Sequence, residues 1–233
     1  MNGRRGPDQL LGIGMTSQRT RARMVERLRD KGIRDERVLA ALASVPRHVF
    51  VDEALSSRAY EDTALPIGFG QTISQPYVVA RMIEALVGPR APGGDGRELG
   101  KVLEVGTGCG YQAAVLARMA REVYSVERIR ALLERARVNL LGLKITNLRL
   151  AHTDGGEGLE KAAPFDSIIV AAAAPQVPRR LLQQLAPGGR MILPVRAHAG
   201  DEQRLLLIER SGREFVESEL DSVRFVPMET GKA

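Results

Sequence analysis

The stretch KVLEVGTGCGYQAAVLARM, residues 101–119, combines a short β-branched run, a glycine-rich loop and a helical pattern. Its first five residues predict a buried strand, and its last nine predict the helix that follows. Between them, Gly106, Gly108 and Gly110 let the backbone turn tightly and approach a ligand with no Cβ in the way. The stretch therefore predicts the first strand, loop and helix of an α/β domain with a ligand site at the loop.

Strands and helices continue to alternate after this stretch, up to about residue 195. Such alternation is typical of a parallel sheet with helices on both faces. Residues 203–220 predict a hairpin that turns at Ser211–Gly212 and adds antiparallel strands at one edge of the sheet. The expected strands are 122–127, 147–152, 165–173 and 190–195, and the expected helices are 128–143 and 177–189.

The chain before residue 101 predicts a helical extension. Residues 1–16 and 88–100 are rich in glycine and lack apolar periodicity, which indicates a flexible tail and a linker. We expect one domain over 17–233, with the extension and a substrate segment in 17–87 and a cofactor-binding core in 101–233. The expected elements of the extension are helices at 17–31, 35–44 and 76–87, an irregular or extended passage at 45–51 and a loop at 60–75.

The composition is that of an ordinary globular protein, with 44% hydrophobic and 27% charged residues. The longest apolar run, residues 168–175, is far short of the roughly 20 residues that span a bilayer. A single cysteine, Cys109, excludes an intramolecular disulfide and is expected to be a small buried thiol. With no Cys/His cluster and no secretory signal, the sequence predicts a cytoplasmic protein without a metal site or a membrane partner.

The formal net charge is +6, and most of the excess lies in residues 1–37. A basic arm of this kind can bind nucleic acid. However, Met24, Val25, Leu28 and Ile33 recur among the arginines at near-helical spacing. We therefore interpret the charge as the solvated face of a helix and expect no nucleic-acid partner.

Three acidic residues lie at the carboxyl ends of predicted strands. Glu104 stands two residues before the glycine loop, where it would repel a pyrophosphate and favour a cationic ligand. Glu127, 21 residues after Gly106, is placed to accept hydrogen bonds from ribose hydroxyls. Asp154 and Gly155 follow the third strand, where an adenine amino group could be held. The set describes a nucleoside pocket without a phosphate and fits S-adenosylmethionine, although each acid alone could instead cap a helix or face solvent.

A second segment, LPIGFGQTISQPYVVARM at residues 65–82, places hydroxyls and amides between glycines and a proline. Together with VPRHVFV, VLEVGTGCGYQAAVLA, FDSIIVAAAAPQVP and LAPGGRMILPV, it resembles the protein-L-isoaspartate (D-aspartate) O-methyltransferase family over residues 19–228. GQTISQP is more specific than the glycine loop, which many methyltransferases share. The resemblance implies a Rossmann-like S-adenosylmethionine-dependent methyltransferase fold, with a mostly parallel sheet, helices on both faces, antiparallel strands at one edge and an N-terminal helical extension.

The resemblance also implies a reaction and a set of site residues. The family moves the methyl group of S-adenosylmethionine to the α-carboxylate of an L-isoaspartyl residue, or to a D-aspartyl side chain, in damaged proteins, and S-adenosylhomocysteine is the other product. The ester closes to a succinimide, whose hydrolysis returns some normal aspartate. The implied active-site serine is Ser74, and the implied substrate contacts are Thr72, Ile73 and Ser74. The implied cofactor contacts are Gln71, Thr72, Ser74, Glu104, Gly106, Gly108, Gly110, Glu127, Arg128, Asp154 and Gly155, with no obligate partner protein.

The reaction gives a physical reason for the hydroxyl groups. A substrate carboxylate is already ionised at neutral pH, so the transfer needs no general base but must hold the oxygen and exclude water. Thr72 and Ser74 suit this task, because a lysine or arginine in direct contact would reduce the nucleophilicity of the carboxylate. Gly68 and Gly70 would let the segment close over the site. The alternative is a plain helix N-cap at Ser74.

Two departures from the family pattern and three other functions stay open. Phe69 stands where several relatives carry a polar residue, and no aromatic residue follows Asp154. A methyltransferase acting on nucleic-acid amines would need an Asn/Asp-Pro-Pro-aromatic group, which AAAAPQVP does not supply. An NAD-dependent oxidoreductase is disfavoured by the G-x-G-x-G spacing and by Glu104. A non-catalytic module that binds isoaspartyl sites is disfavoured by the intact TIS segment.

Overall fold

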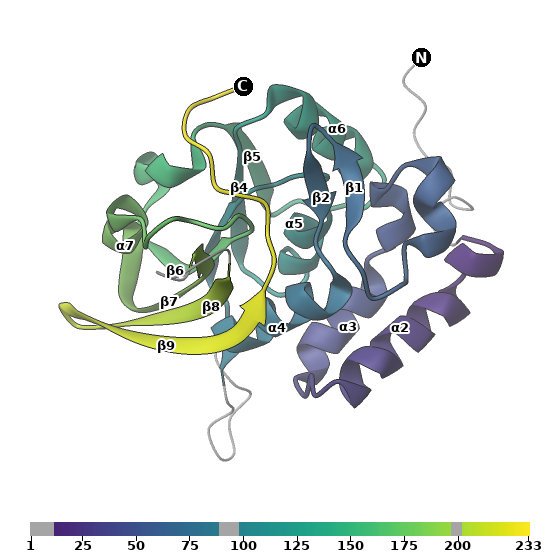
Figure 1. Ribbon diagram of the computed structural model, residues 1–233, viewed down its shortest axis with the longest axis horizontal. Coiled ribbons are helices and arrows are strands. Elements are labelled where there is room, and N and C mark those ends of the chain that lie inside the picture. Colours follow the sequence, from purple (N-terminus) through teal and green to yellow (C-terminus); the bar gives the residue numbers. More distant parts are fainter. Residues whose placement is uncertain (1–11, 89–97, 197–201) are drawn as a thin grey trace.

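The computed structural model describes residues 12–88, 98–196 and 202–233. Most of the predicted flexible tail and linker thus lies outside the described residues. Seven strands form one sheet in the order β5-β4-β3-β6-β7-β8-β9 (Figure 1). The first five strands in this order pair in parallel, and β8 and β9 add two antiparallel pairs at one edge. The strands are β3 Lys101–Val105, β4 Glu122–Glu127, β5 Leu148–His152, β6 Phe165–Val170, β7 Leu185–Arg196, β8 Gln203–Ser211 and β9 Glu214–Val223. This arrangement confirms the predicted sheet and its antiparallel edge.

Apolar side chains of the sheet point alternately to two hydrophobic clusters. Val102 of β3 belongs to one cluster and its neighbour Leu103 to the other, as the two-residue period of a strand requires. The first cluster includes residues of α2 to α6, and the second includes Leu181 of α7. The predicted helices on both faces are therefore confirmed. The helices that cover the sheet are α4 Pro76–Val87, α5 Tyr111–Leu116, α6 Arg130–Leu140 and α7 Arg179–Gln184.

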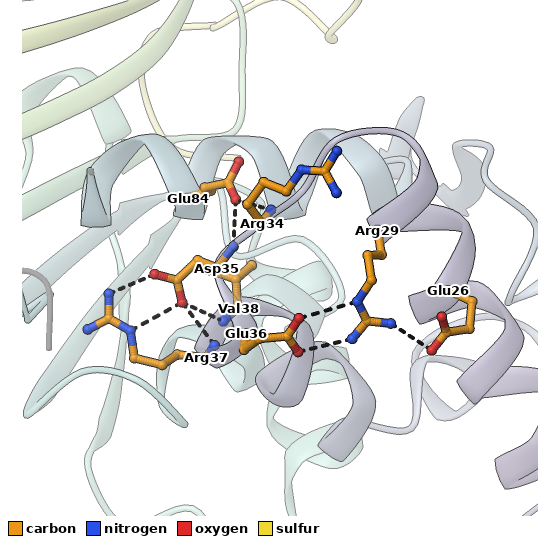
Figure 2. Close-up of polar contacts among 8 residues, drawn as sticks. All are labelled: Glu26, Arg29, Arg34, Asp35, Glu36, Arg37, Val38 and Glu84. Carbon is orange, nitrogen blue, oxygen red and sulfur yellow. Dashed lines mark hydrogen bonds and ion pairs between the residues drawn. The ribbon is translucent and has the colours of Figure 1, made fainter. Parts of the chain in front are cut away.

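The N-terminal extension consists of α2 (Gln18–Asp30) and α3 (Glu36–Ser44), which pack beside α4 (Figure 1). Figure 2 shows how their junction is fixed: Glu84 of α4 accepts hydrogen bonds from the backbone amides of Arg34 and Asp35, at 2.6 and 2.9 Å. The Asp35 side chain in turn caps α3, because it accepts hydrogen bonds from the Arg37 and Val38 amides. The two predicted helices are thus present and are tied to the sheet through α4.

Two predictions for the following segment were wrong. Residues 60–75 are not a plain loop, because Leu65–Gly68 (β1) and Gln71–Ile73 (β2) form a two-stranded antiparallel hairpin. Residues 68–70 make the tight turn, and all three have positive φ. The passage at 45–51, expected to be irregular or extended, contains the 3₁₀ turn η2 (Arg47–Phe50), and a second turn, η3, follows at Glu53–Arg58.

The helix predicted at 177–189 was too long. It ends at Gln184, because β7 begins at Leu185 and pairs with Phe165 of β6 before a register shift. The helices predicted at 111–119 and 128–143 are also shorter in the structure. In contrast, the β8–β9 hairpin turns at the predicted position after Ser211. Beyond β9, the C-terminal segment runs back toward β4 and β5 (Figure 1), and Val226 and Met228 bond to the backbone of Ala173.

Candidate functional site

A pocket lies at the carboxyl ends of β3, β4 and β6, where open α/β sheets bind their ligands. The β1–β2 hairpin forms a second wall, and the C-terminal segment forms a third. The pocket contains about 860 Å³ of empty space, a volume that includes the solvent at its open mouth. Its lining includes Gln71, Thr72, Ile73, Ser74, Gly106, Thr107, Gly108, Cys109, Tyr111, Gln112, Glu127, Arg128, Ile129, Gly155, Ala171, Ala172, Val226, Pro227, Met228 and Glu229.

The glycine loop is folded back onto β4 by backbone hydrogen bonds. The amides of Gly106 and Thr107 both donate to the carbonyl of Val126, at 2.9 and 3.2 Å. Gly106 has φ +95° and Gly108 has φ +54°, in the region that L side chains rarely adopt. A Cβ on Gly106 would make only an ordinary contact with that of Ala171, at 3.4 Å, so the positive φ rather than lack of space favours glycine here.

Glu127 joins the loop to the far side of the pocket. It is 6% exposed; its Oε2 accepts a hydrogen bond from the amide of Gly108 at 2.8 Å, and its Oε1 accepts one from Ile129 at 3.0 Å. Each carboxylate oxygen keeps a second lone pair, so the side chain can still accept hydrogen bonds from ribose hydroxyls. The structure therefore places Glu127 where the sequence analysis expected it.

Glu104 does not line the pocket. It is fully buried on β3, where the hydroxyl of Ser125 hydrogen-bonds to Oε2, while Oε1 has no partner among the described residues. Burial raises the pKa of Glu104 to about 8, although the Ser125 hydrogen bond lowers it. The carboxyl group is thus uncharged at neutral pH. Gln112 is the second group that lowers this pKa; it stands at the pocket wall, and its amide makes no hydrogen bond of ordinary geometry within the described residues.

Two unsatisfied buried groups beside the pocket fit a cationic ligand that carries an amino-acid end. Buried polar groups are nearly always hydrogen-bonded, so the Gln112 amide and Glu104 Oε1 are available to a ligand or to water. A positive charge placed in the pocket would favour ionisation of Glu104. The residues present therefore fit S-adenosylmethionine, whose sulfonium and amino groups are cationic.

Asp154 also lies outside the lining, whereas the next residue, Gly155, is part of it. One oxygen of Asp154 accepts the amide of Gly156 at 2.8 Å, and the other accepts the amide of Gly231. The Asp154 side chain thus fixes the C-terminal segment as well as its own 3₁₀ turn, η4 (Gly155–Glu157). Arg128 lines the pocket and holds the same segment through an ion pair with Glu229 at 2.7 Å.

The hairpin wall presents Thr72, Ile73 and Ser74 to the pocket. Ser74 does not cap α4, because Gln75 occupies the N-cap position and makes no side-chain cap, so the alternative role proposed from sequence does not apply. Asp62 fixes this junction: it accepts hydrogen bonds from the Tyr77 amide at 2.9 Å and from the Gln75 side chain at 3.0 Å. The Ser74 hydroxyl is therefore not engaged in starting the helix.

A groove continues from the pocket on the side of β9. Thr72, Ser74, Ala171 and Val226 line both hollows, so they form the boundary between them. The rest of the groove contains apolar side chains together with polar groups. These further residues include Tyr77, Val78, Arg81, Leu205, Asp221, Ser222, Arg224 and Phe225. The two hollows can hold two different ligands that meet at Ser74.

The structure brings together most of the predicted site residues, and it adds others. Glu104, Gly110 and Asp154 stand behind the lining. Sequence reasoning missed Ala171 and Ala172, which directly follow β6, and it missed residues 226–229. The position of the alanines at a strand's carboxyl end could have indicated them, but nothing in VPME alone predicts that it returns to the pocket.

The described residues contain no cluster of metal-ligating side chains. Within the same ranges, no helix is long and apolar enough to span a membrane. Cys109 is buried, as predicted, and burial raises the pKa of its thiol to about 11, so it is not a reactive thiolate.

Comparisons with known proteins identify the family. A sequence profile of the family described as "Protein-L-isoaspartate(D-aspartate) O-methyltransferase (PCMT)" matches residues 19–233. A protein-L-isoaspartate O-methyltransferase of Dechloromonas aromatica is 64% identical over 95% of this chain and 99% of its own length, and one of Methylobacillus flagellatus is 60% identical over 94% and 96%.

Two solved structures are similar in fold. A protein-L-isoaspartate O-methyltransferase superimposes with a TM-score of 0.78 at 28% identity, over 89% of this chain and 65% of that one. A putative enzyme of the same name from Plasmodium falciparum, in complex with S-adenosyl-L-homocysteine, gives 0.74 at 26% identity, over 90% of this chain and 98% of that one. These structures confirm the predicted fold class.

Proposed function

This chain belongs to the protein-L-isoaspartate(D-aspartate) O-methyltransferase family, and from that membership we propose the reaction it performs. It transfers the methyl group of S-adenosylmethionine to the free carboxylate of an L-isoaspartyl residue, or of a D-aspartyl residue, in a damaged protein. The ester then closes to a succinimide, whose hydrolysis restores some normal aspartate. The observation that carries the proposal is the boundary at Thr72 and Ser74, because these two residues line both the pocket beside the glycine loop and the neighbouring groove.

The cofactor is held by the glycine loop and its neighbours in this proposal. When bound, S-adenosylmethionine supplies a methyl group on a positively charged sulfur. Glu127 accepts hydrogen bonds from the ribose, while Arg128, Gly155 and the segment 226–229 enclose the rest. Glu104, behind Gln112, contributes negative charge once it ionises. The Gln71–Ser74 strand closes the side that faces the substrate.

The substrate carboxylate is held at the end of β2. It is already ionised, so no side chain has to remove a proton, and no general base is required. The hydroxyls of Thr72 and Ser74 can donate hydrogen bonds that orient the attacking oxygen without neutralising it. Ile73, which is buried, anchors the strand between these two hydroxyl-bearing residues. The apolar part of the groove excludes water from the ester product.

The partners follow from the same reaction. Damaged proteins and peptides that carry isoaspartyl residues are the proposed substrates. The cytoplasmic location, and the absence of nucleic-acid and membrane partners, stay proposals that rest on the sequence alone.

The test follows transfer of labelled methyl to two peptides that differ only in an isoaspartyl or a normal aspartyl linkage. Wild type, Ser74→Ala and the control Ser44→Ala are compared; the Ser44 hydroxyl bonds to the Ala41 carbonyl within α3. We expect base-labile label on the isoaspartyl peptide alone. Ser74→Ala should lower kcat/KM on the order of 100-fold, the usual effect of removing one positioning donor, and Ser44→Ala should not.

Two outcomes would contradict the proposal. Binding of the isoaspartyl peptide and of S-adenosylmethionine without any transfer would indicate a non-catalytic module. Equal labelling of both peptides would indicate a carboxyl methyltransferase of a different specificity.

A further inference from the structure

Arg47 is a fully buried arginine that no step of the proposed reaction uses. It begins the 3₁₀ turn η2. Its Nη2 donates a hydrogen bond to the carbonyl of Ser74 at 2.7 Å, and its Nε donates one to the carbonyl of Ala59 at 2.8 Å. Its guanidinium lies 4.7 Å from the ring centroid of Tyr111, within the range of a cation–π contact. One side chain thus joins three segments of the chain.

Arg47 makes no ion pair with any of the described residues. Its Nη1 makes no hydrogen bond of ordinary geometry within the described residues. The carboxylate that acts on its charge, Asp62, is not in contact with it and already forms an ion pair with Lys31. Two carbonyls and an aromatic face offset only part of the free energy of burying a guanidinium, which stays ionised because the intrinsic pKa of arginine is so high. A buried cation without a carboxylate in direct contact is stabilised further when a negative group arrives near it.

Arg47 lies directly behind the wall where the negative group of the substrate is expected. It does not line the pocket itself, but two of the residues that it contacts, Ser74 and Tyr111, do. Ser74 also lines the peptide groove. A carboxylate held by the Ser74 hydroxyl would therefore be one residue away from the guanidinium and separated from it by protein rather than by water.

We propose, on the basis of the proposed function, that Arg47 is a positioning residue whose buried charge selects an ionised substrate carboxylate at Ser74 without touching it. The hydrogen bond to the Ser74 carbonyl fixes the backbone that carries the hydroxyl. The distance of one residue matters chemically, because a cation in direct contact would withdraw electron density from the attacking oxygen. A cation in the next layer still attracts the carboxylate, since water does not screen it there.

The proposal is tested by binding rather than by activity alone. Two peptides are compared in the presence of S-adenosylhomocysteine: one with an isoaspartyl residue and its free α-carboxylate, and the same peptide with that group as a carboxamide. Calorimetry gives the ratio of the two dissociation constants for wild type, Arg47→Met and Arg47→Lys. Arg21→Met serves as the matched control, because Arg21 is also buried but donates to Tyr60 and Ala43, which lie outside the pocket lining.

We expect wild type to prefer the carboxylate peptide on the order of ten-fold or more. Arg47→Met should remove most of that preference, whereas Arg47→Lys should keep the preference but lower kcat about ten-fold, because lysine cannot bridge both carbonyls. Arg21→Met should keep the wild-type ratio. If the role of Arg47 were purely structural, Arg47→Met would weaken the binding of both peptides equally and leave the ratio of their dissociation constants unchanged. That result would overturn the proposal.

Ser74→Ala keeps the proposal testable if Arg47→Met does not fold. It removes the hydroxyl but keeps the carbonyl and Arg47, so the preference for the carboxylate should persist at lower affinity. A wild type without any preference, or a preference that vanishes in Ser74→Ala, would overturn the proposal. The transfer assay separates this failure from failure of the proposed function: if the isoaspartyl peptide is methylated while the ratio is insensitive to Arg47, only the role of Arg47 is wrong.

Discussion

The two main walls of the pocket are built in different ways. The core wall, from β3 to the start of α5, is held by the sheet: the amides of Gly106 and Thr107 bond to the β4 backbone. The hairpin wall, from β2 to the start of α4, is held by side chains that come from elsewhere in the chain, Arg47 and Asp62. Backbone register leaves the first wall little freedom, whereas charged side chains determine the position of the second.

In the proposed function, this difference corresponds to the two ligands. The cofactor, which is the same in every turnover, contacts the core wall, whose position is set by backbone hydrogen bonds of the sheet. A peptide substrate with a variable sequence is met by the wall that side chains can adjust. Four predictions test this division, from the largest expected effect to the smallest.

The first prediction concerns the buried carboxyl group behind the core wall. The pKa of Glu104 is about 8 in the folded protein, mainly because of burial, and 4.5 is its ordinary value. Between these values the folded state binds the extra proton, so stability must fall as pH rises. From pH 5 to pH 8 we expect a loss on the order of 3 kcal/mol for wild type without ligand. Glu104→Gln should lack this loss.

The measurement is the free energy of unfolding by denaturant at several pH values, taken as the difference between wild type and Glu104→Gln. The difference isolates Glu104, because all other groups titrate in both proteins. A difference that does not change between pH 5 and pH 8 would mean that Glu104 is ionised throughout, and that the core wall carries a fixed negative charge.

The second prediction removes the carboxylate that joins the loop to the ribose site. Glu127→Ala should weaken S-adenosylhomocysteine about 100-fold, or ~2.7 kcal/mol, because the ligand loses its acceptors and the Gly108 amide loses its partner. Calorimetry measures this directly. Glu122→Ala is the control, since Glu122 lies at the other end of β4 in an exposed ion pair with Arg149. If Glu127→Ala changed the dissociation constant of S-adenosylhomocysteine by less than three-fold, Glu127 would not bind the ribose.

The third prediction addresses the hairpin wall through Asp62. Burial alone would raise the pKa of Asp62, but the hydrogen bonds from Lys31, Tyr77 and Gln75 together lower it below its ordinary value. The ionised carboxylate therefore stabilises the fold above that ordinary value, and the contribution is lost as pH falls through the lower, folded-state pKa. Asp62→Asn should lower the free energy of unfolding by about 2 kcal/mol at pH 7. The difference from wild type should become progressively smaller as the pH is lowered.

The same variant should raise the KM for the peptide while the affinity for S-adenosylhomocysteine stays unchanged. Asp52→Asn is the control, because Asp52 forms an exposed ion pair with Arg135 that is worth little. If Asp62→Asn weakened the binding of the peptide and of S-adenosylhomocysteine equally, the two walls would not act independently, and the contrast drawn between them would be wrong.

The smallest effect is expected at the tip of the hairpin. Phe69 has φ +54° and is 62% exposed, so it keeps a left-handed conformation with little burial to offset the strain. Phe69→Asn should stabilise the protein by about 0.5 kcal/mol, because asparagine tolerates this region better. Thermal unfolding of Phe69→Asn and of the control Phe69→Ala distinguishes strain from lost contacts. A larger destabilisation by asparagine than by alanine would show that strain is not the reason.

The core wall could be predicted from the sequence, and the hairpin wall could not. The run KVLEV is β-branched and continuous, and the glycines that follow it identify a strand, loop and helix without reference to the rest of the chain. The strands β1 and β2 have only four and three residues, and β1 contains Pro66 and Gly68. The alternating burial of β1 is therefore too short to identify a strand from the sequence. Their pairing depends on the tight turn at 68–70, which local propensity does not reveal.

The burial of Glu104 and the early start of β7 could not be predicted for a different reason. A carboxylate at the end of a strand can point into the pocket or into the core, and only the face on which the residue lies decides between them. Glu104 points into the core, beside Ser125. The segment LAPGG carries the usual signals of a helix end, but Leu185 pairs with Phe165 of β6, so the segment belongs to β7. Contacts between distant segments outweigh the local preference here.

The third wall, residues 226–229, has a consequence for synthesis of the protein. These residues follow every strand of the sheet, and they close a pocket whose other walls begin at Gln71. A ribosome therefore makes all of the sheet before the cofactor site is complete. A ligand stabilises only a state that can bind it, so S-adenosylmethionine can stabilise the finished chain but not the partly made one. The nascent sheet must fold on its own hydrophobic clusters, and chaperones would meet it before the cofactor does.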